Sequence, residues 1–79
     1  MATAYVLINC DLGFDAEIIE ELIHVSDVKE ANGVFGAYDI LAKVESDQIR
    51  TLRETITRKI RKIDRVRTTL TLLVIEELT

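Results

Sequence analysis

The hydrophobic residues of the first ten positions follow a pattern typical of a β-strand. Residues 2–10 contain a run of β-forming side chains with no helical spacing, namely Tyr5, Val6, Leu7 and Ile8. Asp11, Leu12 and Gly13 then interrupt the run. We therefore expect a first strand that ends near Cys10.

The apolar spacing becomes helical after this break. Ile18, Ile19, Leu22 and Ile23 share one stripe, which predicts a helix over roughly residues 15–25. Asp15 is a suitable N-cap, and Phe14 before it can pack on Ile19 as a hydrophobic staple.

Two short β-type runs follow, over residues 28–35 and 40–45, and their closeness in sequence predicts an antiparallel hairpin. Apolar residues then recur at helical spacing, namely Ile49, Leu52, Ile56, Ile60 and Ile63. This spacing predicts a second helix capped by Ser46 or Asp47. A last strand from about Arg65 to Glu76 is apolar on both faces.

The element order is therefore β-α-β-β-α-β, with neither a linker nor a proline. Two right-handed strand-helix-strand units most simply give a ferredoxin-like α+β fold, with a four-stranded antiparallel sheet and both helices on one face. The apolar last strand implies that the other sheet face is covered by a second subunit. We expect a dimer that forms through the sheet.

Length and composition agree with this expectation. A chain of 79 residues makes one domain, 1–79, and folding at this size removes only about 60% of the unfolded chain's surface from water. Oligomerisation is the commonest remaining way to bury more apolar surface in a chain with one cysteine and no evident metal cage. The single cysteine and the lack of a signal-peptide pattern suggest the cytoplasm, and no apolar run is long enough to span a membrane.

Residues that could carry catalysis are few. His24 and Cys10 are isolated from any nucleophile or base, so structural roles suit both better than catalytic ones. Neither HxxxH nor CxxC occurs, and the three glycines form no phosphate-binding loop. We expect no metal, no cofactor and no enzymatic activity.

Charge is unevenly distributed in a chain whose formal net charge is −4. Between Arg50 and Arg67 there are eight basic residues and two acidic ones. No aromatic residue is interleaved with them, so a solvated helix face, or ion pairs with the acidic first helix of another subunit, accounts for them better than nucleic-acid binding.

The interruption between the two hairpin strands consists of Gly36, Ala37, Tyr38 and Asp39. Gly36 can adopt a positive φ, which suits a turn and a ligand loop equally. Asp39 has two interpretations that the residues alone leave open. It could bond backbone N–H groups as a turn residue, or it could hold the ammonium group of a ligand.

Two motifs resemble the effector-binding, or RAM, domain of the Lrp/AsnC (leucine-responsive, feast/famine) regulators. The segment VFGAYDILAKV, residues 34–44, is similar to the family's hydrophobic-x-G-x-[YF]-D motif followed by an apolar strand. The segment VRTTLT, residues 66–71, is similar to its V-x-x-T-x-T motif. The resemblance covers nearly the whole chain.

The resemblance implies dimers that pair their sheets, often assembled as an octamer of four dimers, with small effectors such as amino acids bound between dimers. It also implies ligand-binding residues in the loop and the last strand, namely Gly36, Tyr38, Asp39, Thr69 and Thr71. With the family in view, a ligand-facing Asp39 becomes the favoured interpretation.

Two departures from the family pattern change what is expected. Family members normally carry an N-terminal helix-turn-helix domain, whereas this chain starts at the first strand and resembles a stand-alone module without sequence-specific DNA binding. The family tends to have a Pro-Gly turn before the last strand, where this chain has residues 62–65, KIDR.

The sequence therefore predicts an effector-binding and oligomerisation module linked to transcription regulation, which could assemble with full-length Lrp/AsnC regulators. Two alternatives remain. One is a small dimeric enzyme of the cofactor-free monooxygenase type, which shares a similar subunit topology. The other is a purely structural oligomerisation domain.

Overall fold

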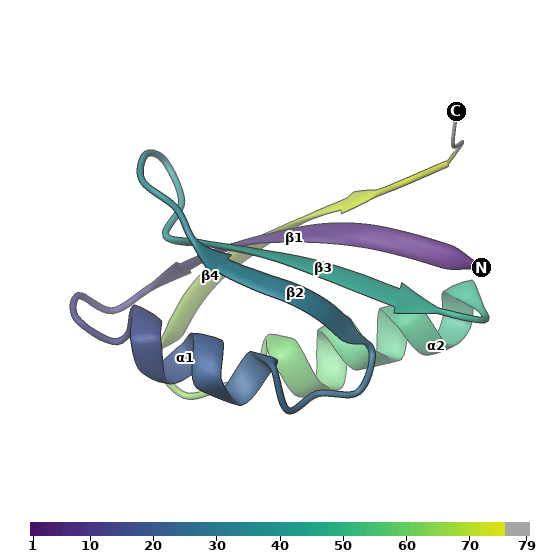
Figure 1. Ribbon diagram of the computed structural model, residues 1–79, viewed down its shortest axis with the longest axis horizontal. Coiled ribbons are helices and arrows are strands. Elements are labelled where there is room, and N and C mark those ends of the chain that lie inside the picture. The colour runs from purple at the N-terminus through teal and green to yellow at the C-terminus, as the bar shows by residue number, and fades with distance from the viewer. Residues whose placement is uncertain (76–79) are drawn as a thin grey trace.

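The computed structural model describes residues 1–75, which form four strands and two helical segments in the expected order. The elements are β1 (Ala2–Cys10), α1 (Asp15–Leu22), β2 (Val28–Gly33), β3 (Ile40–Ser46), α2 (Ile49–Glu54), the π-helical segment η1 (Thr55–Ile60) and β4 (Val66–Leu73). Figure 1 shows α2 continuing directly into η1, and we call the pair the second helix. The predicted last strand reaches Glu76, which lies outside the described residues.

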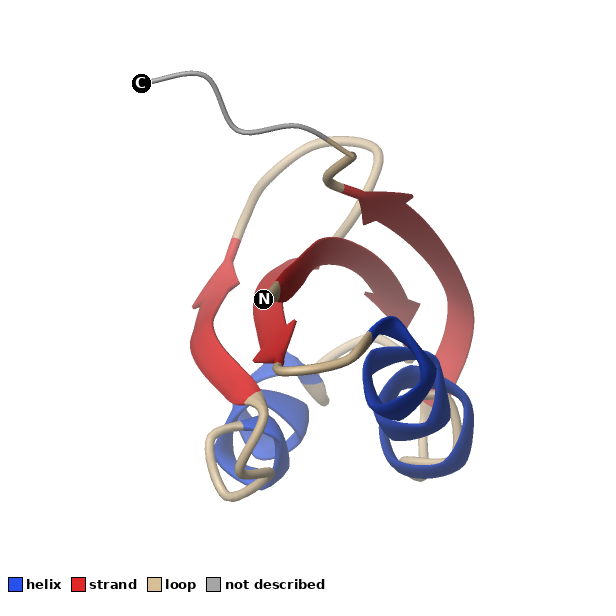
Figure 2. Ribbon diagram, turned by 90° about the vertical axis from the view of Figure 1, so that its right-hand side faces the viewer, coloured by secondary structure: helices blue, strands red, loops and turns tan. Residues whose placement is uncertain are grey.

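The strands form one antiparallel sheet in the order β2-β3-β1-β4. Figure 2 shows both helices on the same side of this sheet, and within residues 1–75 no helix covers the other side. The ferredoxin-like α+β fold and the antiparallel hairpin of β2 and β3 are thus confirmed.

The pairing register determines which side chains face the helices. Val6 of β1 pairs with Ala42 of β3 and Thr71 of β4, so these three residues share the helix-covered face. The core forms there, from apolar side chains of both layers: Ala4, Val6, Ile8, Ile18, Leu22, Val28, Ile40, Ala42, Val44, Leu52, Ile56 and Ile60. The helical spacing of Leu52, Ile56 and Ile60 correctly predicted the buried stripe of the second helix.

The opposite side of the sheet carries a second apolar surface. Tyr5 pairs with Lys43 and Leu72, while Leu7 pairs with Leu41 and Leu70, which places all of them on the face without helices. Leu70 and Leu72 are 43% and 51% exposed. We call Tyr5, Leu7, Leu41, Leu70 and Leu72 the open sheet face.

Both predicted helix caps were wrong. The N-cap of α1 is Phe14 and that of α2 is Gln48, and neither donates or accepts a side-chain capping hydrogen bond. Asp15 is instead the first residue of α1, where its negative charge still favours the positive end of the helix dipole. The preceding loop sets the entry of the chain, because Phe14 N–H donates to the Asp11 carbonyl at 3.1 Å.

The second helix widens to π geometry at Thr55, a residue that helical spacing alone does not place in the core. Thr55 is 5% exposed, and its hydroxyl donates to Asp27 Oδ2 at 2.7 Å. The hydroxyl would be costly to bury without this partner. The bond links the second helix to the turn that precedes β2. The same turn is bonded to β3, because the Asp27 carbonyl accepts the Glu45 N–H at 2.8 Å.

The turn before β4 places Arg65 in the left-handed region, with φ of 77°. A glycine would adopt this conformation with little strain, and arginine is held there by tertiary contacts. Its carbonyl accepts the Asp11 N–H at 2.9 Å, and its guanidinium lies 4.7 Å from the centroid of the Phe14 ring. The KIDR segment therefore makes the turn without proline or glycine.

Candidate functional site

The loop between β2 and β3 is closed by a backbone hydrogen bond from Val34 N–H to the Asp39 carbonyl at 2.8 Å. Gly36 within it has φ of 143°, a conformation that side chains disfavour. Phe35 is fully exposed, whereas Tyr38 and Asp39 are partly buried. Asp39 is therefore the loop carboxylate that turns back toward the sheet.

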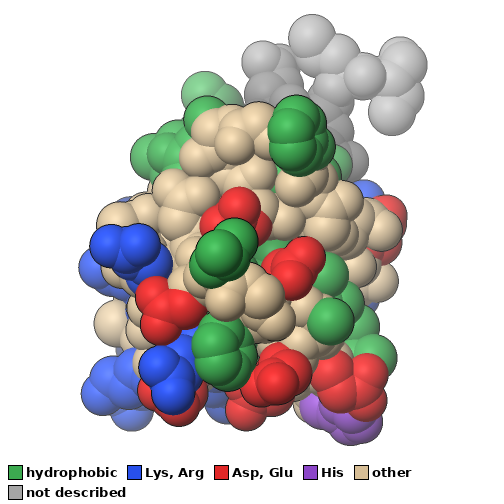
Figure 3. Space-filling view, turned by 90° about the vertical axis from the view of Figure 1, so that its left-hand side faces the viewer, with side chains coloured by type: hydrophobic (Ala, Val, Ile, Leu, Met, Phe, Trp, Pro, Cys, Tyr) green, Lys and Arg blue, Asp and Glu red, His purple; other side chains and the backbone are tan. Residues whose placement is uncertain are grey.

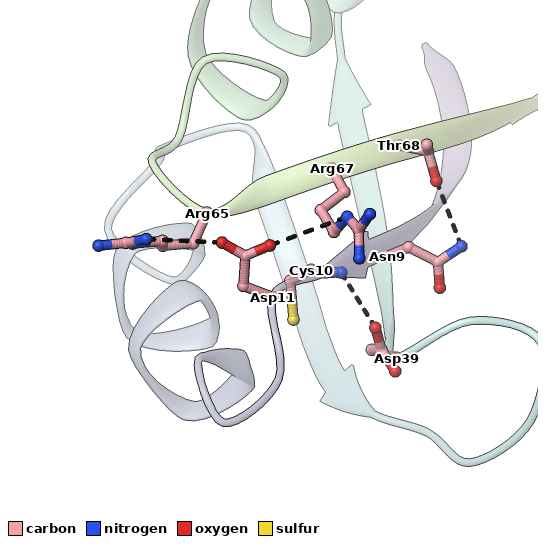
Figure 4. Close-up of polar contacts among 7 residues, drawn as sticks. All are labelled: Asn9, Cys10, Asp11, Asp39, Arg65, Arg67 and Thr68. Atoms are coloured by element: carbon pink, nitrogen blue, oxygen red, sulfur yellow. Dashed lines mark hydrogen bonds and ion pairs between the residues drawn. The ribbon is translucent and has the colours of Figure 1, made fainter.

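Asp39 holds the end of β1 with both its backbone and its side chain. Its N–H donates to the Ile8 carbonyl at 2.9 Å, and its Oδ2 accepts the Cys10 N–H at 3.0 Å (Figure 4). Pairing between β1 and β3 ends at Ile8 and Ile40, and the register of β1 against β4 shifts between Asn9 and Cys10. The carboxylate therefore satisfies a strand N–H beyond the last paired residue.

Two adjoining hollows lie beside this carboxylate, with volumes of about 250 and 270 Å³. Cys10, Asp39 and Arg67 line both of them. Asp11, Leu12, Gly13 and Asp15 complete one, and Asn9 and Thr68 complete the other. We call this region the Asp39 site.

Charges of both signs meet in the Asp39 site (Figure 4). Asp11 lies between two arginines, with Oδ2 3.6 Å from Arg65 Nη1 and Oδ1 3.8 Å from Arg67 Nε. The side chain of Arg67 is 70% exposed, and Asp11 meets its guanidinium at one nitrogen only. Arginine has five N–H donors, so this contact leaves Arg67 able to receive an anion.

The same surroundings change the pKa of the Cys10 thiol. Burial raises its pKa, and the negative charge and side-chain hydrogen bonding of Asp39 raise it further, with Asp15 and Asp11 adding to the effect. A thiol with a raised pKa is a poor nucleophile at neutral pH. The structural role expected for Cys10 agrees with this pKa.

The structure brings only part of the predicted ligand set to this site. Asp39 lines both hollows, whereas Gly36 and Tyr38 belong to the loop beside it. Thr69 and Thr71 pair with Ile8 and Val6 on the helix-covered face and line neither hollow. Their participation in ligand binding stays a prediction.

Three residues of the site were not predicted from the sequence, namely Arg67, Asn9 and Thr68. Asn9 Nδ2 donates to Thr68 Oγ1 at 3.2 Å across the β1–β4 pair (Figure 4). Alternation could have signalled Thr68, since a strand that directs Leu70 and Leu72 to one face directs residue 68 there as well. No local pattern indicates that Arg67 lies beside Asp39. Arg67 belongs to β4 and Asp39 is bonded to the end of β1, and these two strands become neighbours only in the folded sheet.

The other hollows differ from the Asp39 site, because none of them combines an exposed arginine with a loop carboxylate that accepts a strand N–H. One, of about 500 Å³, lies at the other end of the sheet and is polar, and one of about 370 Å³ lies beside the end of α1. Within residues 1–75, no group of three or more His, Cys, Asp or Glu side chains could hold a metal ion. The same residues include no helix long and apolar enough to cross a membrane.

The family model of the Lrp/AsnC ligand-binding domain matches residues 3–79, and the chain belongs to this family. A hypothetical protein from Pyrococcus horikoshii is 40% identical, with a TM-score of 0.91 over 98% of this chain and 93% of that one. AsnC of E. coli is 26% identical, with a TM-score of 0.89 over 96% of this chain and 52% of AsnC, so this chain spans about half of that regulator.

A transcriptional regulator from Neisseria meningitidis, solved with L-methionine, shows the same fold at 12% identity. Its TM-score is 0.83 over 99% of this chain and 52% of the regulator. No curated protein matches the chain. The family and its structural neighbours are transcription regulators rather than enzymes.

Proposed function

We propose that this protein is an amino-acid-sensing and oligomerisation module that acts in transcription regulation and has no enzymatic activity of its own. The observation that carries the proposal is the Asp39 site, where a loop carboxylate anchored by the Cys10 N–H lies beside an exposed arginine. Membership of a ligand-binding domain family of regulators supports it, as does the occurrence of this fold in a regulator solved with L-methionine.

The charges suit a zwitterion. The Cys10 N–H engages one oxygen of Asp39, which orients the carboxylate toward the hollows and fixes the position at which a ligand ammonium would bind. Arg67 supplies the opposite charge for the ligand's carboxylate, and arginine binds carboxylates with two parallel N–H bonds. An α-amino acid carries both groups on one carbon, so it can engage both residues together.

The site is shallow, and two exposed apolar side chains lie at or near its rim. Each hollow is smaller than the roughly 300–1,000 Å³ of a pocket that buries most of a drug-sized ligand. Leu12 is 99% exposed, and Phe35 in the neighbouring loop is fully exposed. Figure 3 shows hydrophobic side chains standing out from this end of the molecule. A neighbouring dimer would cover this rim and provide the missing wall, as expected for an effector bound between dimers.

The open sheet face supports dimerisation. Five apolar side chains from three strands form a continuous surface there, which is unusual for a face in contact with water. Lys43 and Glu45 lie beside it as an ion pair of 3.4 Å, and the hydrogen bond that Lys43 donates to Glu45 raises the pKa of Lys43. A second copy placed on this face would bury the leucines and leave the ion pair at the rim.

The regulatory role follows from linkage between ligand binding and assembly. An effector that binds better to one assembly state shifts the population toward it. The two helices of residues 1–75 are separated by β2 and β3, so they do not form a helix-turn-helix. We assign sequence-specific DNA contact to full-length Lrp/AsnC regulators in the cytoplasm. This effector-binding module would form mixed assemblies with them.

Thermal unfolding in the presence of each of the twenty amino acids tests the proposal. A ligand at 100 times its Kd stabilises the folded protein by about 2.7 kcal/mol, which gives a melting-temperature shift of roughly 10–20 °C in a domain of this size. The Arg67→Gln variant should lose most of this shift while its unliganded melting temperature stays within about 2 °C. The absence of a shift with all twenty would support the purely structural alternative, and an equal shift in Arg67→Gln would remove Arg67 from the site.

A further inference from the structure

The two helices present surfaces of opposite charge on the same side of the sheet. Every charged residue of α1 is acidic and exposed, namely Asp15, Glu17, Glu20 and Glu21. Residues 49–62 carry six exposed cations against the single acid Glu54, namely Arg50, Arg53, Arg58, Lys59, Arg61 and Lys62. We call these two sets the acidic surface and the basic surface.

These charges are not neutralised within the chain. Within residues 1–75, Lys43 forms an ion pair with Glu45, and Asp11 forms ion pairs with Arg65 and Arg67. Arg65 also forms an ion pair with Asp64. None of them uses a side chain of the acidic or the basic surface. Figure 2 shows the two helices lying apart on the same side of the sheet, which keeps the two charge sets from meeting in one subunit.

We propose that the helical layer is a second interface between copies of this chain, in which the acidic surface of one copy binds the basic surface of another. The arrangement is self-complementary. A two-fold axis that lies in the interface and is perpendicular to the line joining the two helices exchanges their positions. It therefore brings each α1 opposite the partner's second helix, twice, as an isologous contact requires.

A second copy fits these charges better than a nucleic acid does. A duplex laid across the helical layer would meet the four acids of α1 as well as the cations, and the chain as a whole carries a net charge of −4. A second copy of the chain carries the acidic surface, which is therefore present at the same concentration as the basic surface. Complementary potentials of this kind favour one register and suppress the others.

The two proposed interfaces differ in their physics. The open sheet face is apolar, so its pairing is insensitive to salt, whereas the helical contact depends on exposed charges that are individually weak. At 1 M salt the screening length falls to about 3 Å, against about 10 Å at 0.1 M. Two different two-fold interfaces on one chain join dimers into larger closed or extended assemblies.

Sedimentation velocity at 0.1 M and 1 M NaCl tests the helical contact separately from the sheet contact. The measurement is made without added amino acid, so that the ligand-linked contact between dimers at the Asp39 site is not engaged. Under this condition we expect assemblies larger than a dimer at 0.1 M and dimers at 1 M. Glu20→Lys/Glu21→Lys should give dimers at both salt concentrations, and so should Arg58→Glu/Lys62→Glu. The control Asp47→Lys reverses an exposed acid that lies outside both surfaces, and it should assemble as the unmodified chain does.

Mixing the two helix variants gives the decisive result. The first variant has two acids and two lysines on α1, and the second keeps four cations beside two new acids on its basic surface, so each variant pairs weakly with itself. A mixed pair has one unmodified contact, between the basic surface of the first variant and the acidic surface of the second, and one contact in which the two charge reversals oppose each other. The large assemblies should therefore return on mixing at 0.1 M NaCl. Failure to recover on mixing, or assembly that is unchanged at 1 M NaCl, would overturn the proposal. Retention of a DNA duplex at 0.1 M NaCl that Arg58→Glu/Lys62→Glu abolishes, without any change in assembly, would assign the basic surface to nucleic acid instead.

Discussion

Asp39 Oδ2 accepts the backbone N–H of Cys10 at 3.0 Å, across 29 positions of sequence. This bond fixes the β2–β3 loop against the end of β1 and directs a carboxylate into the hollows that Arg67 also lines. The interpretation of Asp39 as a residue that bonds nearby N–H groups of its own turn is therefore not confirmed, because the N–H that its carboxylate accepts belongs to Cys10 of another strand. The interpretation of Asp39 as a ligand residue stays a prediction.

Asp39→Asn should separate the bond to Cys10 from ligand binding. Asparagine keeps an oxygen that can accept the Cys10 N–H, so the melting temperature and the dimer should change little. Loss of the charge should weaken amino-acid binding by about 1.5–3 kcal/mol, or roughly 10- to 150-fold in Kd. Calorimetric titration with the amino acid chosen by thermal screening measures this, with Asp39→Ala, which loses the Cys10 bond as well, as the destabilised comparison. Equal affinities in the unmodified and Asn proteins would remove Asp39 from the ligand site.

Leu72→Lys should dissociate the sheet-paired dimer. Leu72 lies opposite Tyr5 on the open sheet face, and a buried lysine without a partner is strongly unfavourable. Its neighbour Thr71 is exposed on the other face, so Thr71→Lys is the matched control and should leave the dimer intact. Sedimentation equilibrium at micromolar concentration in 1 M NaCl gives the answer. A Leu72→Lys protein that stays dimeric there would show that the open sheet face is not the interface.

Thr55→Val should destabilise the fold by about 1–3 kcal/mol, because it leaves the partly buried Asp27 carboxylate without its hydroxyl donor. Thr57→Val, at an exposed position of the same helical segment, should change the free energy of unfolding by less than about 0.5 kcal/mol. Urea unfolding of the two variants provides the comparison. If both lost the same stability, the cost would come from placing valine in this helical segment rather than from the lost hydrogen bond.

Cys10 should react slowly with iodoacetamide at neutral pH, because its raised pKa leaves little thiolate. The rate should reach half its maximum at a higher pH than for a free cysteine, and Asp39→Asn should lower that pH. The folded thiol holds its proton more tightly than the unfolded one. The resulting stability is therefore complete below the unfolded pKa and is lost as the pH rises from there through the folded pKa. An alkylation profile that Asp39→Asn leaves unmoved would show that the carboxylate does not act on the thiol.

The sequence by itself determined the order of elements and the core of this protein. The spacing of Leu52, Ile56 and Ile60 defines one face of a helix, and the alternation of Val6 and Ile8 with Leu7 defines two faces of a strand. Such patterns are local, since they depend only on the 3.6-residue and two-residue periods of helix and strand. The glycine requirement at Gly36 was predictable for the same reason, because it depends on the backbone of one residue.

The tertiary structure alone decided how the site is composed and where the helices begin. Cys10, Asp39 and Arg67 come from separate segments and meet only because β1 is the central neighbour of β3 and β4 in the sheet. Asp15 does not cap α1, because the loop from Asp11 to Phe14 positions the helix start first. Thr55 is buried because Asp27 lies opposite it. In each case the deciding contact joins residues that are distant in sequence, or depends on how a loop packs, and no local periodicity records such contacts.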